Sequence, residues 1–321
     1  MIGYSYNDIS IVPSVTSKIK SRNDVFIGEL PIFTAPMSTI VDSVNPYKYE
    51  CNNINPIVPR NIDINIRLTL LEQYWIAVSL KEAEEHFLND TFNGDCLTLC
   101  IDIANGHMDQ LLSLCDKLKK KYGDYISLMT GNIANPDTLN YYMNTGIKYV
   151  RLGIGAGSGC ITSSNLGIHY PMASLIKECY KIKERSNSEI RLVADGGIRN
   201  YSDVIKALAL GADYVMIGGL FATLEDILPE NVYTRDGKKY RKFYGMASKE
   251  GQKDLNKQVF TTAEGLVKEV EVNGTLHQWS KNMLDYLKSA MSYCNAFTLP
   301  EFIGKPEIII NSIGTLNSVN K

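Results

Sequence analysis

Cys160 directly follows a segment, residues 153–159 (GIGAGSG), in which every second residue is glycine. Glycine destabilises the interiors of helices and strands, so this density indicates a backbone shape that side chains would obstruct. Three chemistries fit: a phosphate cradle, a cation site made of carbonyls, or a loop that presents a nucleophile. Thr162, Ser163 and Ser164 follow the cysteine, and these polar surroundings favour a reactive thiol over a buried one. A thiolate is both nucleophile and leaving group, as covalent addition to an electrophilic carbon requires.

Two glycine pairs form a second candidate site. Gly196-Gly197 and Gly218-Gly219 each follow an apolar run. Glycine lets the backbone approach a ligand closely, and backbone N–H groups after neighbouring barrel strands commonly bind phosphate. The pairs therefore predict a phosphorylated ligand, with tight turns that bind nothing as the alternative. Alone, this pattern also fits flavin mononucleotide barrels and several phosphosugar enzymes.

Eight short apolar runs, separated by segments of helical period, must position these residues. They span residues 31–37, 54–60, 75–80, 97–103, 126–132, 149–155, 191–197 and 214–220. Continuously apolar strands that alternate with helices are typical of a parallel sheet buried on both faces, so the pattern predicts an α/β fold, a (β/α)8 TIM barrel. Asp102, Asn132, Gly155, Asp195 and Gly218 lie at the C-terminal ends of these runs, the end at which such barrels carry their active sites.

Helical spacing predicts helices over residues 107–122, 201–213 and 277–294. For the second helix we expect Ser202 as N-cap and an end near Gly211. Residues from about 225 to 274 are charged, rich in lysine and glycine, and only weakly periodic. A long excursion of this kind favours a functional lid, so we expect one barrel domain over residues 1–321 with a flap at about 225–274.

Composition excludes several function classes. The net charge is -2, which argues against nucleic acid as the main partner. Seven cysteines, an odd number without metal-ligand spacing, indicate reduced thiols and no zinc site. The N-terminus lacks the pattern of a signal peptide, and no apolar run is long enough to cross a membrane. We therefore expect a soluble, cytoplasmic protein.

The segment GIGAGSGCIT resembles the cysteine loop of the IMP dehydrogenase/GMP reductase family. Further landmarks follow in the family's order: YNDISIVP, TAPMSTI, DIANGH, TGN, ADGGI, MIGGLFA, FYGMAS and AEG. The resemblance covers nearly the whole chain. It implies a (β/α)8 barrel, GMP and IMP as small-molecule substrate and product, and a homotetramer.

The resemblance implies a role for each matching residue. Cys160 would be the nucleophile that adds to C2 of the purine, and Thr162 and Glu264 match the pair that handles the proton of the leaving amine. The implied substrate contacts are Ser158, Gly196, Gly197, Gly218 and Gly219 for the 5′-phosphate, Asp195 for the ribose, Gly245, Met246 and Ala247 for the base, and Tyr244 beside them. The backbone carbonyls of Gly155, Gly157 and Cys160 resemble the family's K+ site.

The family divides by the fate of the covalent enzyme–nucleotide adduct. The dehydrogenase oxidises IMP with NAD and hydrolyses the adduct to XMP, whereas the reductase expels ammonia from GMP and reduces C2 with NADPH. Three features favour the reductase: no regulatory domain is inserted between the second and third strands, DIANGH and FYGMAS are similar to reductase forms, and residues 249–265 contain no arginine to activate water. A short IMP dehydrogenase is the alternative. A flavin or phosphosugar barrel and a catalytically silent nucleotide-binding protein are the alternatives from other classes.

The resemblance also implies a cofactor site. Asp102, Ile103 and Ala104 match the nicotinamide side, and Ser21, Arg22 and Arg60 match positions near the cofactor's phosphates. Ile154 and Gly155 are further implied cofactor contacts. An arginine there suits the 2′-phosphate of NADPH, because its guanidinium forms bidentate, charge-assisted hydrogen bonds. The alternative is that both arginines are ordinary surface charges.

Overall fold

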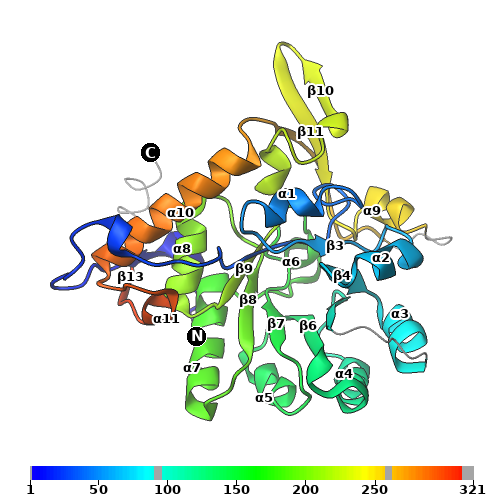
Figure 1. Ribbon diagram of the computed structural model, residues 1–321, viewed down its shortest axis with the longest axis horizontal. Helices are drawn as coiled ribbons and strands as arrows, with labels where there is room; N and C mark the ends of the chain where they lie inside the picture. The colour runs from blue at the N-terminus through cyan, green and yellow to red at the C-terminus, as the bar shows by residue number, and fades with distance from the viewer. Residues whose placement is uncertain (1, 90–95, 257–261, 313–321) are drawn as a thin grey trace.

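An eight-stranded parallel sheet forms the centre of the structure, a computed structural model that describes residues 2–89, 96–256 and 262–312. The strands follow the order β2-β9-β8-β7-β6-β5-β4-β3 (Figure 1). They are β2 (Ile32–Thr34), β3 (Ile57–Val58), β4 (Trp75–Val78), β5 (Leu97–Asp102), β6 (Ile126–Ile133), β7 (Tyr149–Leu152), β8 (Arg191–Asp195) and β9 (Tyr214–Ile217). Each predicted apolar run overlaps one of these strands, so the predicted barrel is confirmed.

The barrel closes between β2 and the residues that precede β3. The N–H of Thr34 donates to the carbonyl of Asn55 at 3.0 Å, and the N–H of Asn55 donates to the carbonyl of Ile32 at 2.9 Å. β3 covers only two residues of its predicted run. Pro56 and Pro59 flank it, and proline has no N–H to donate to a neighbouring strand.

Three long helices confirm the helical predictions: α4 (Asp109–Tyr122), α8 (Tyr201–Leu210) and α10 (Leu276–Tyr293). Ser202 as the N-cap of α8 was wrong, because it already lies inside the helix. Asn200 caps α8, since its backbone is extended and its side chain accepts the N–H of Asp203 at 3.0 Å. Gly211 ends the helix with a φ of 116°.

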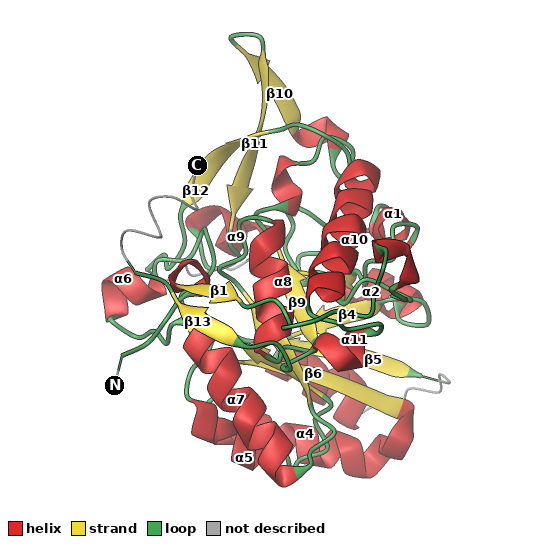
Figure 2. Cartoon of the chain, turned by 90° about the vertical axis from the view of Figure 1, so that its left-hand side faces the viewer, coloured by secondary structure: helices red, strands yellow, loops and turns green. Residues whose placement is uncertain are grey.

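The remaining helices outside the flap segment are mostly short and pack around the sheet (Figure 2). They are α1 (Pro46–Glu50), α2 (Ile64–Leu70), α3 (Leu80–Ala83), α5 (Leu139–Tyr142), α6 (Thr162–Leu166), α7 (Met172–Ser186) and α11 (Leu299–Phe302). No helix of the described residues is long and apolar enough to cross a membrane.

Aromatic rings fill the N-terminal end of the barrel interior. Trp75, Tyr149 and Tyr214 each begin a strand and pack around Phe33 of β2, with ring centroids 5.0–5.9 Å apart. Apolar packing seals this end of the barrel. The polar side chains at the opposite end are therefore left to form a site.

A two-stranded antiparallel sheet, which the sequence analysis did not predict, joins the ends of the described chain. It pairs β1 (Ile9–Ile11) with β13 (Ile308–Ile310). Three-residue strands are too short to show a period of two, so only their pairing across the molecule identifies them.

The segment predicted to be a flap forms a three-stranded antiparallel sheet and a short helix. Its elements are β10 (Val232–Arg235), β11 (Lys238–Tyr244), α9 (Lys249–Asp254) and β12 (Val267–Glu271). The β10–β11 hairpin projects away from the barrel in both views (Figures 1 and 2). Arg241 anchors β11, because its guanidinium donates to the carbonyls of Ala222, Leu224 and Leu228 at 2.9–3.0 Å. Residues 257–261 of this segment lie outside the described residues.

Candidate active site

A cavity of about 240 Å³ opens at the C-terminal end of the barrel. Its wall comes from the loops after β7, β8 and β9 and from the flap segment. The predicted residues that line it are Ser158, Cys160, Asp195, Gly196, Gly197, Gly218, Gly219, Gly245, Met246, Ala247 and Glu264. The structure thus brings nearly all the predicted catalytic and substrate-contacting residues to one cavity.

Cys160, Thr162 and Glu264 form a continuous line of hydrogen bonds. The thiol of Cys160 donates to Oγ1 of Thr162 at 3.1 Å, and the Thr162 hydroxyl donates to Oε2 of Glu264 at 2.9 Å. A hydroxyl both donates and accepts, so Thr162 can pass a proton between its two neighbours. The Thr162 hydroxyl therefore links a nucleophile to a carboxyl group, an arrangement suited to general acid–base catalysis.

Backbone hydrogen bonds fasten this line to the flap segment. The N–H of Ile161 donates to the carbonyl of Glu264 at 3.0 Å, and the N–H of Leu266 donates to the carbonyl of Gly159 at 2.9 Å. On its other side, the N–H of Glu264 donates to the carbonyl of Ala247 at 3.1 Å. Glu264 is therefore held between the cysteine loop and the predicted base-contacting turn, so its position depends on the flap.

The glycines of the predicted phosphate site allow close approach of backbones. A Cβ at Gly219 would lie 2.6 Å from Oγ of Ser158, and one at Gly196 would lie 3.0 Å from the backbone nitrogen of Gly157. Gly196 also has a φ of 103°, which side chains rarely adopt. The cysteine loop therefore packs directly onto both glycine turns, and any larger residue at Gly219 would displace the Ser158 hydroxyl.

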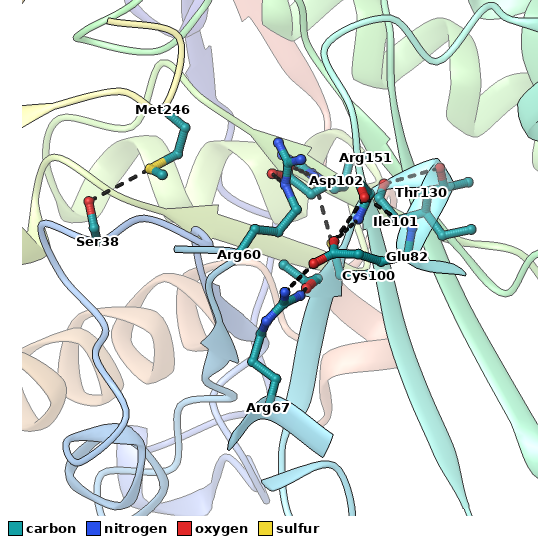
Figure 3. A network of polar contacts seen from close by, with 12 residues as sticks. Ser38, Arg60, Arg67, Glu82, Cys100, Ile101, Asp102, Thr130, Arg151 and Met246 are labelled. Atoms are coloured by element: carbon teal, nitrogen blue, oxygen red, sulfur yellow. Dashed lines mark hydrogen bonds and ion pairs between the residues drawn. The ribbon is translucent and has the colours of Figure 1, made fainter. Parts of the chain in front are cut away.

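A buried arginine, which the sequence analysis missed, links Asp102 to Asp195, and Figure 3 shows it beside Asp102. Arg151 is 7% exposed and donates to Oδ1 of Asp102 at 2.8 Å and to Oδ2 of Asp195 at 2.9 Å. Asn132 also donates to Oδ2 of Asp195, at 2.7 Å. The sequence signal for this network was Arg151 itself, a charged residue inside the otherwise apolar run YVRL. Among the described residues, every hydrogen bond to the Asp195 side chain ends on Oδ2, which leaves Oδ1 for a ligand.

Electrostatics keep this network charged. Burial opposes ionisation of Asp102, but the positive charges of Arg151 and Arg60 outweigh burial and hold the pKa of Asp102 below its ordinary value. Burial likewise opposes the charge of Arg151, yet Asp195 and its other neighbours raise the Arg151 pKa well above the ordinary value. The site therefore contains a fixed, compensated set of charges.

The residues predicted to bind the cofactor fall into two places. Nε of Arg60 donates to Oδ2 of Asp102 at 3.1 Å, so these two predicted residues meet. Ser21 instead caps the short turn at Arg22–Asp24, and Arg22 forms an ion pair with Asp285 of α10 at 3.5 Å. Within one chain, the described contacts do not join Ser21 and Arg22 to Arg60.

The other predicted cofactor positions lie on two loops, the one after β5 and the cysteine loop. Ile103 and Ala104 directly follow β5, and Ala104 is exposed. The carbonyl of Ile154 is 3.1 Å from Nδ1 of His169. Gly155 lines a second cavity behind the cysteine loop.

Tyr244 differs from the other predicted substrate contacts because it does not line the cavity wall. Its hydroxyl donates to Oδ2 of Asp254 at 2.9 Å, and Ser38 donates to the same oxygen at 2.6 Å. Burial and the hydrogen bond to Asp254 raise the pKa of Tyr244 to about 12. Asp254 thus fastens α9 of the flap to the loop after β2, beside Met246. Sequence reasoning missed Asp254, because an aspartate near a helix end carries no long-range signal.

Two of the three carbonyls predicted to bind K+ already accept hydrogen bonds within the loop. The Ser163 hydroxyl donates to the carbonyl of Gly155 at 3.2 Å, and the N–H of Cys160 donates to the carbonyl of Gly157 at 3.0 Å. Each carbonyl oxygen has two lone pairs, so these hydrogen bonds leave room for a cation, and the K+ site stays a prediction.

Comparisons with known proteins agree with the arrangement. The model of the family described as "IMP dehydrogenase / GMP reductase domain" matches residues 75–318. A GMP reductase of Lactobacillus gasseri is 28% identical over 97% of this chain and 96% of its own length. A GMP reductase of Aliivibrio fischeri is 31% identical over 75% of this chain and 70% of its own length. GMP reductase 2 of Mus musculus is 31% identical over 63% of this chain and 58% of its own length.

Proposed function

The chain belongs to the IMP dehydrogenase/GMP reductase family, and we propose that it is a GMP reductase that converts GMP to IMP and ammonia with NADPH. One observation carries the proposal: the hydrogen-bonded line from Cys160 through Thr162 to Glu264, in a cavity walled by glycine turns suited to phosphate. Relatives named GMP reductase that align over nearly the whole chain support the same branch.

The substrate's position follows from the cavity wall. The backbone N–H groups of Gly196, Gly197, Gly218 and Gly219, with Ser158, would hold the 5′-phosphate. The free Oδ1 of Asp195 would accept a ribose hydroxyl, while Arg151 and Asn132 fix the other oxygen. This would place C2 of the purine at the Cys160 thiol.

The chain's own groups perform the first half of the reaction. Cys160 attacks C2 of GMP as a thiolate and forms a carbon–sulfur bond. As the thiol ionises, its proton passes through the Thr162 hydroxyl to Glu264, and Glu264 returns a proton through Thr162 to the amine on C2, which leaves as ammonia. The product of this half is a thioimidate between Cys160 and the nucleotide.

One observation supports NADPH as the cofactor of the predicted cofactor-binding residues. Among the described residues, Arg60 uses only Nε, on Asp102, so both terminal nitrogens of its guanidinium remain available to a phosphate. Asp102, Ile103 and Ala104 would hold the nicotinamide side. Bound there, NADPH would supply a hydride to C2 of the adduct, and the Cys160 thiolate would then be released.

Hydrolysis of the adduct, the dehydrogenase outcome, would require a base that activates water. Residues 249–265 contain no arginine for that role. A dedicated base is worth about 10²–10⁴ in rate, so hydride addition should prevail. The homotetramer implied by the resemblance and the cytoplasmic location expected from the composition stay predictions.

A spectrophotometric assay at a wavelength specific for reduced nicotinamide tests the function. GMP with NADPH should lose absorbance only when the protein is present, and IMP with NAD should give little change. Rapid reduction of NAD in the presence of IMP would instead identify a short IMP dehydrogenase. A yellow purified protein would indicate a flavin barrel, and GMP binding without turnover would indicate a silent nucleotide-binding protein.

A further inference from the structure

Two segments far apart in the chain converge on one carboxylate beside the predicted base-contacting turn, residues 245–247. Oδ2 of Asp254, at the end of α9, accepts the hydroxyl hydrogen of Ser38 at 2.6 Å and that of Tyr244 at 2.9 Å. Ser38 follows β2 of the barrel, whereas Tyr244 ends β11 of the flap. The two ends of residues 244–254 therefore meet at one oxygen, and Ser38 ties that oxygen to the barrel.

The helix between these two ends packs directly onto the turn. A Cβ at Gly251 of α9 would lie 2.5 Å from the carbonyl oxygen of Gly245 and 2.5 Å from Cα of Met246, so only glycine allows this contact. The N–H of Ser248 donates to the carbonyl of Gly245 at 3.0 Å, and Oγ of Ser248 accepts the N–H of Gly251 at 3.0 Å. α9 and the turn thus form one packed unit, and a shift of either would move the other.

The turn transmits its position to the cavity on both sides. Oγ of Ser38 lies 3.7 Å from Sδ of Met246, a contact that Figure 3 shows. On the other side, the carbonyl of Ala247 accepts the N–H of Glu264 at 3.1 Å. Met246, Ala247 and Glu264 all line the cavity with Cys160. A displaced turn would therefore reach the purine through Met246 and the proposed acid through Ala247.

We propose that Asp254 is a positioning residue that fixes the purine of the substrate and the carboxyl group of Glu264, because it anchors the base-contacting turn to Ser38. Among the described residues, Asp254 is not one of those that line the cavity, so it acts through the turn and not on the nucleotide. The anchor depends on hydrogen-bond acceptance, since both donors are neutral hydroxyls. The proposal rests on the proposed function, since it gives the turn a part in the reduction of GMP.

Three variants and a matched control test the anchor. Asp254→Leu removes the acceptor, and the double variant Ser38→Ala, Tyr244→Phe removes both donors while the carboxylate stays. Asp254→Asn keeps an oxygen with two lone pairs, which can accept from both hydroxyls. Glu250→Leu is the control, because Glu250 is a carboxylate of the same helix whose side chain has no hydrogen bond or ion pair with any described residue.

Three measurements separate positioning from general damage to the fold. Turnover of GMP with NADPH gives kcat and KM for both reactants. Hydrogen exchange of residues 245–255, followed by mass spectrometry with and without GMP, needs no turnover and reports local opening of the turn. Urea unfolding of each variant measures its free energy of unfolding.

Asp254→Leu should lower kcat about tenfold and raise KM for GMP about threefold, because a misplaced acid slows the chemical step and a misplaced turn weakens the base contacts. KM for NADPH should stay within about twofold, since the predicted cofactor residues lie on other loops. Exchange should become faster in residues 245–255 and stay unchanged in the glycine turns after β8 and β9. Asp254→Asn should retain most of the activity, and Glu250→Leu should match the unmutated protein.

The double variant should lose as much activity as Asp254→Leu, because both remove the same two hydrogen bonds. Combining all three substitutions should reduce activity no further, since groups that act through one oxygen are not additive. If Asp254→Leu does not fold, the double variant still gives the loss in activity and the change in exchange.

Losses that add in the triple variant would overturn the proposal. So would an Asp254→Leu variant that matches Glu250→Leu in both turnover and exchange, or one in which KM for NADPH rises as much as KM for GMP. If the unmutated protein fails to reduce GMP at all, the proposed function fails, but the exchange profiles still decide whether Asp254 holds the turn.

Discussion

Thr162 donates its hydroxyl hydrogen to Glu264 at 2.9 Å, although the two residues are 102 positions apart in the chain. Thr162 follows the seventh strand of the chain, β7, whereas Glu264 belongs to the flap segment. The contact therefore makes the chemistry of the barrel dependent on the flap. It also separates two functions, since the glycine turns that would hold the nucleotide do not include either residue.

This separation predicts the behaviour of Cys160→Ser. Turnover should be abolished, because a serine hydroxyl is a poor nucleophile without a dedicated base and its alkoxide is a poor leaving group. GMP affinity should stay within about tenfold of the unmutated protein, because the phosphate and ribose contacts are made elsewhere. Calorimetric titration with GMP and a turnover assay measure the two quantities, and appreciable activity in the variant would eliminate Cys160 as the nucleophile.

Glu264→Gln should slow the release of ammonia far more than it weakens GMP binding. Glutamine keeps the size of the side chain and can still contact Thr162, but it cannot donate the proton that the leaving amine needs. The expected loss in ammonia release is about 10²-fold or more. A rapid-quench assay that measures ammonia separately from IMP checks this, and unchanged ammonia release would assign the proton to another group.

Arg60 should govern the choice between NADPH and NADH. A charged hydrogen bond to the 2′-phosphate is worth about 1.5–3 kcal/mol, which corresponds to a preference for NADPH of at least about tenfold. Arg60→Ala should remove most of this preference while GMP affinity changes little. The ratio of kcat/KM for the two cofactors is the measurement. Equal efficiency in the unmutated protein would refute the assignment.

Arg151 should be important for stability as well as for the site. Arg151→Met would leave Asp102 and Asp195 largely buried without their shared cation, so we expect a loss of about 3–5 kcal/mol in the free energy of unfolding. Arg191→Gln is the control, because Arg191 forms a half-exposed pair with Asp213, which Lys183 also contacts. Urea unfolding of both variants measures the difference, and equal losses would contradict a special role for Arg151.

The same network predicts a pH dependence. The folded state lowers the pKa of Asp102, so this carboxylate contributes stability above its unfolded pKa of about 3.9, and the contribution is lost as pH falls through the folded value. The stability gap between the unmutated protein and Asp102→Asn should therefore be widest at neutral pH and narrow below about pH 4. Urea unfolding at several pH values measures the gap, and a gap that stays constant would be inconsistent with a lowered Asp102 pKa.

The sequence predicts the barrel well because its strands are mainly apolar and alternate with segments of helical period. It predicts the cavity's residues because glycine turns and a cysteine loop are local patterns. Arg151 could not be foreseen, since its partners lie on β5 and β8 and only closure of the sheet brings them together. Asp254 depends in the same way on how the flap folds back, which no local pattern encodes.

The fate of the Cys160 adduct tests the account most directly. GMP and NADPH are incubated with the unmutated protein, and IMP, XMP, ammonia and oxidised cofactor are quantified together. Because residues 249–265 contain no arginine to activate water, the account predicts IMP, ammonia and oxidised cofactor in equal amounts, with at most a trace of XMP. XMP as the main product, or its rapid formation from IMP and NAD in a parallel reaction, would show that water and not hydride resolves the adduct, and would contradict the account.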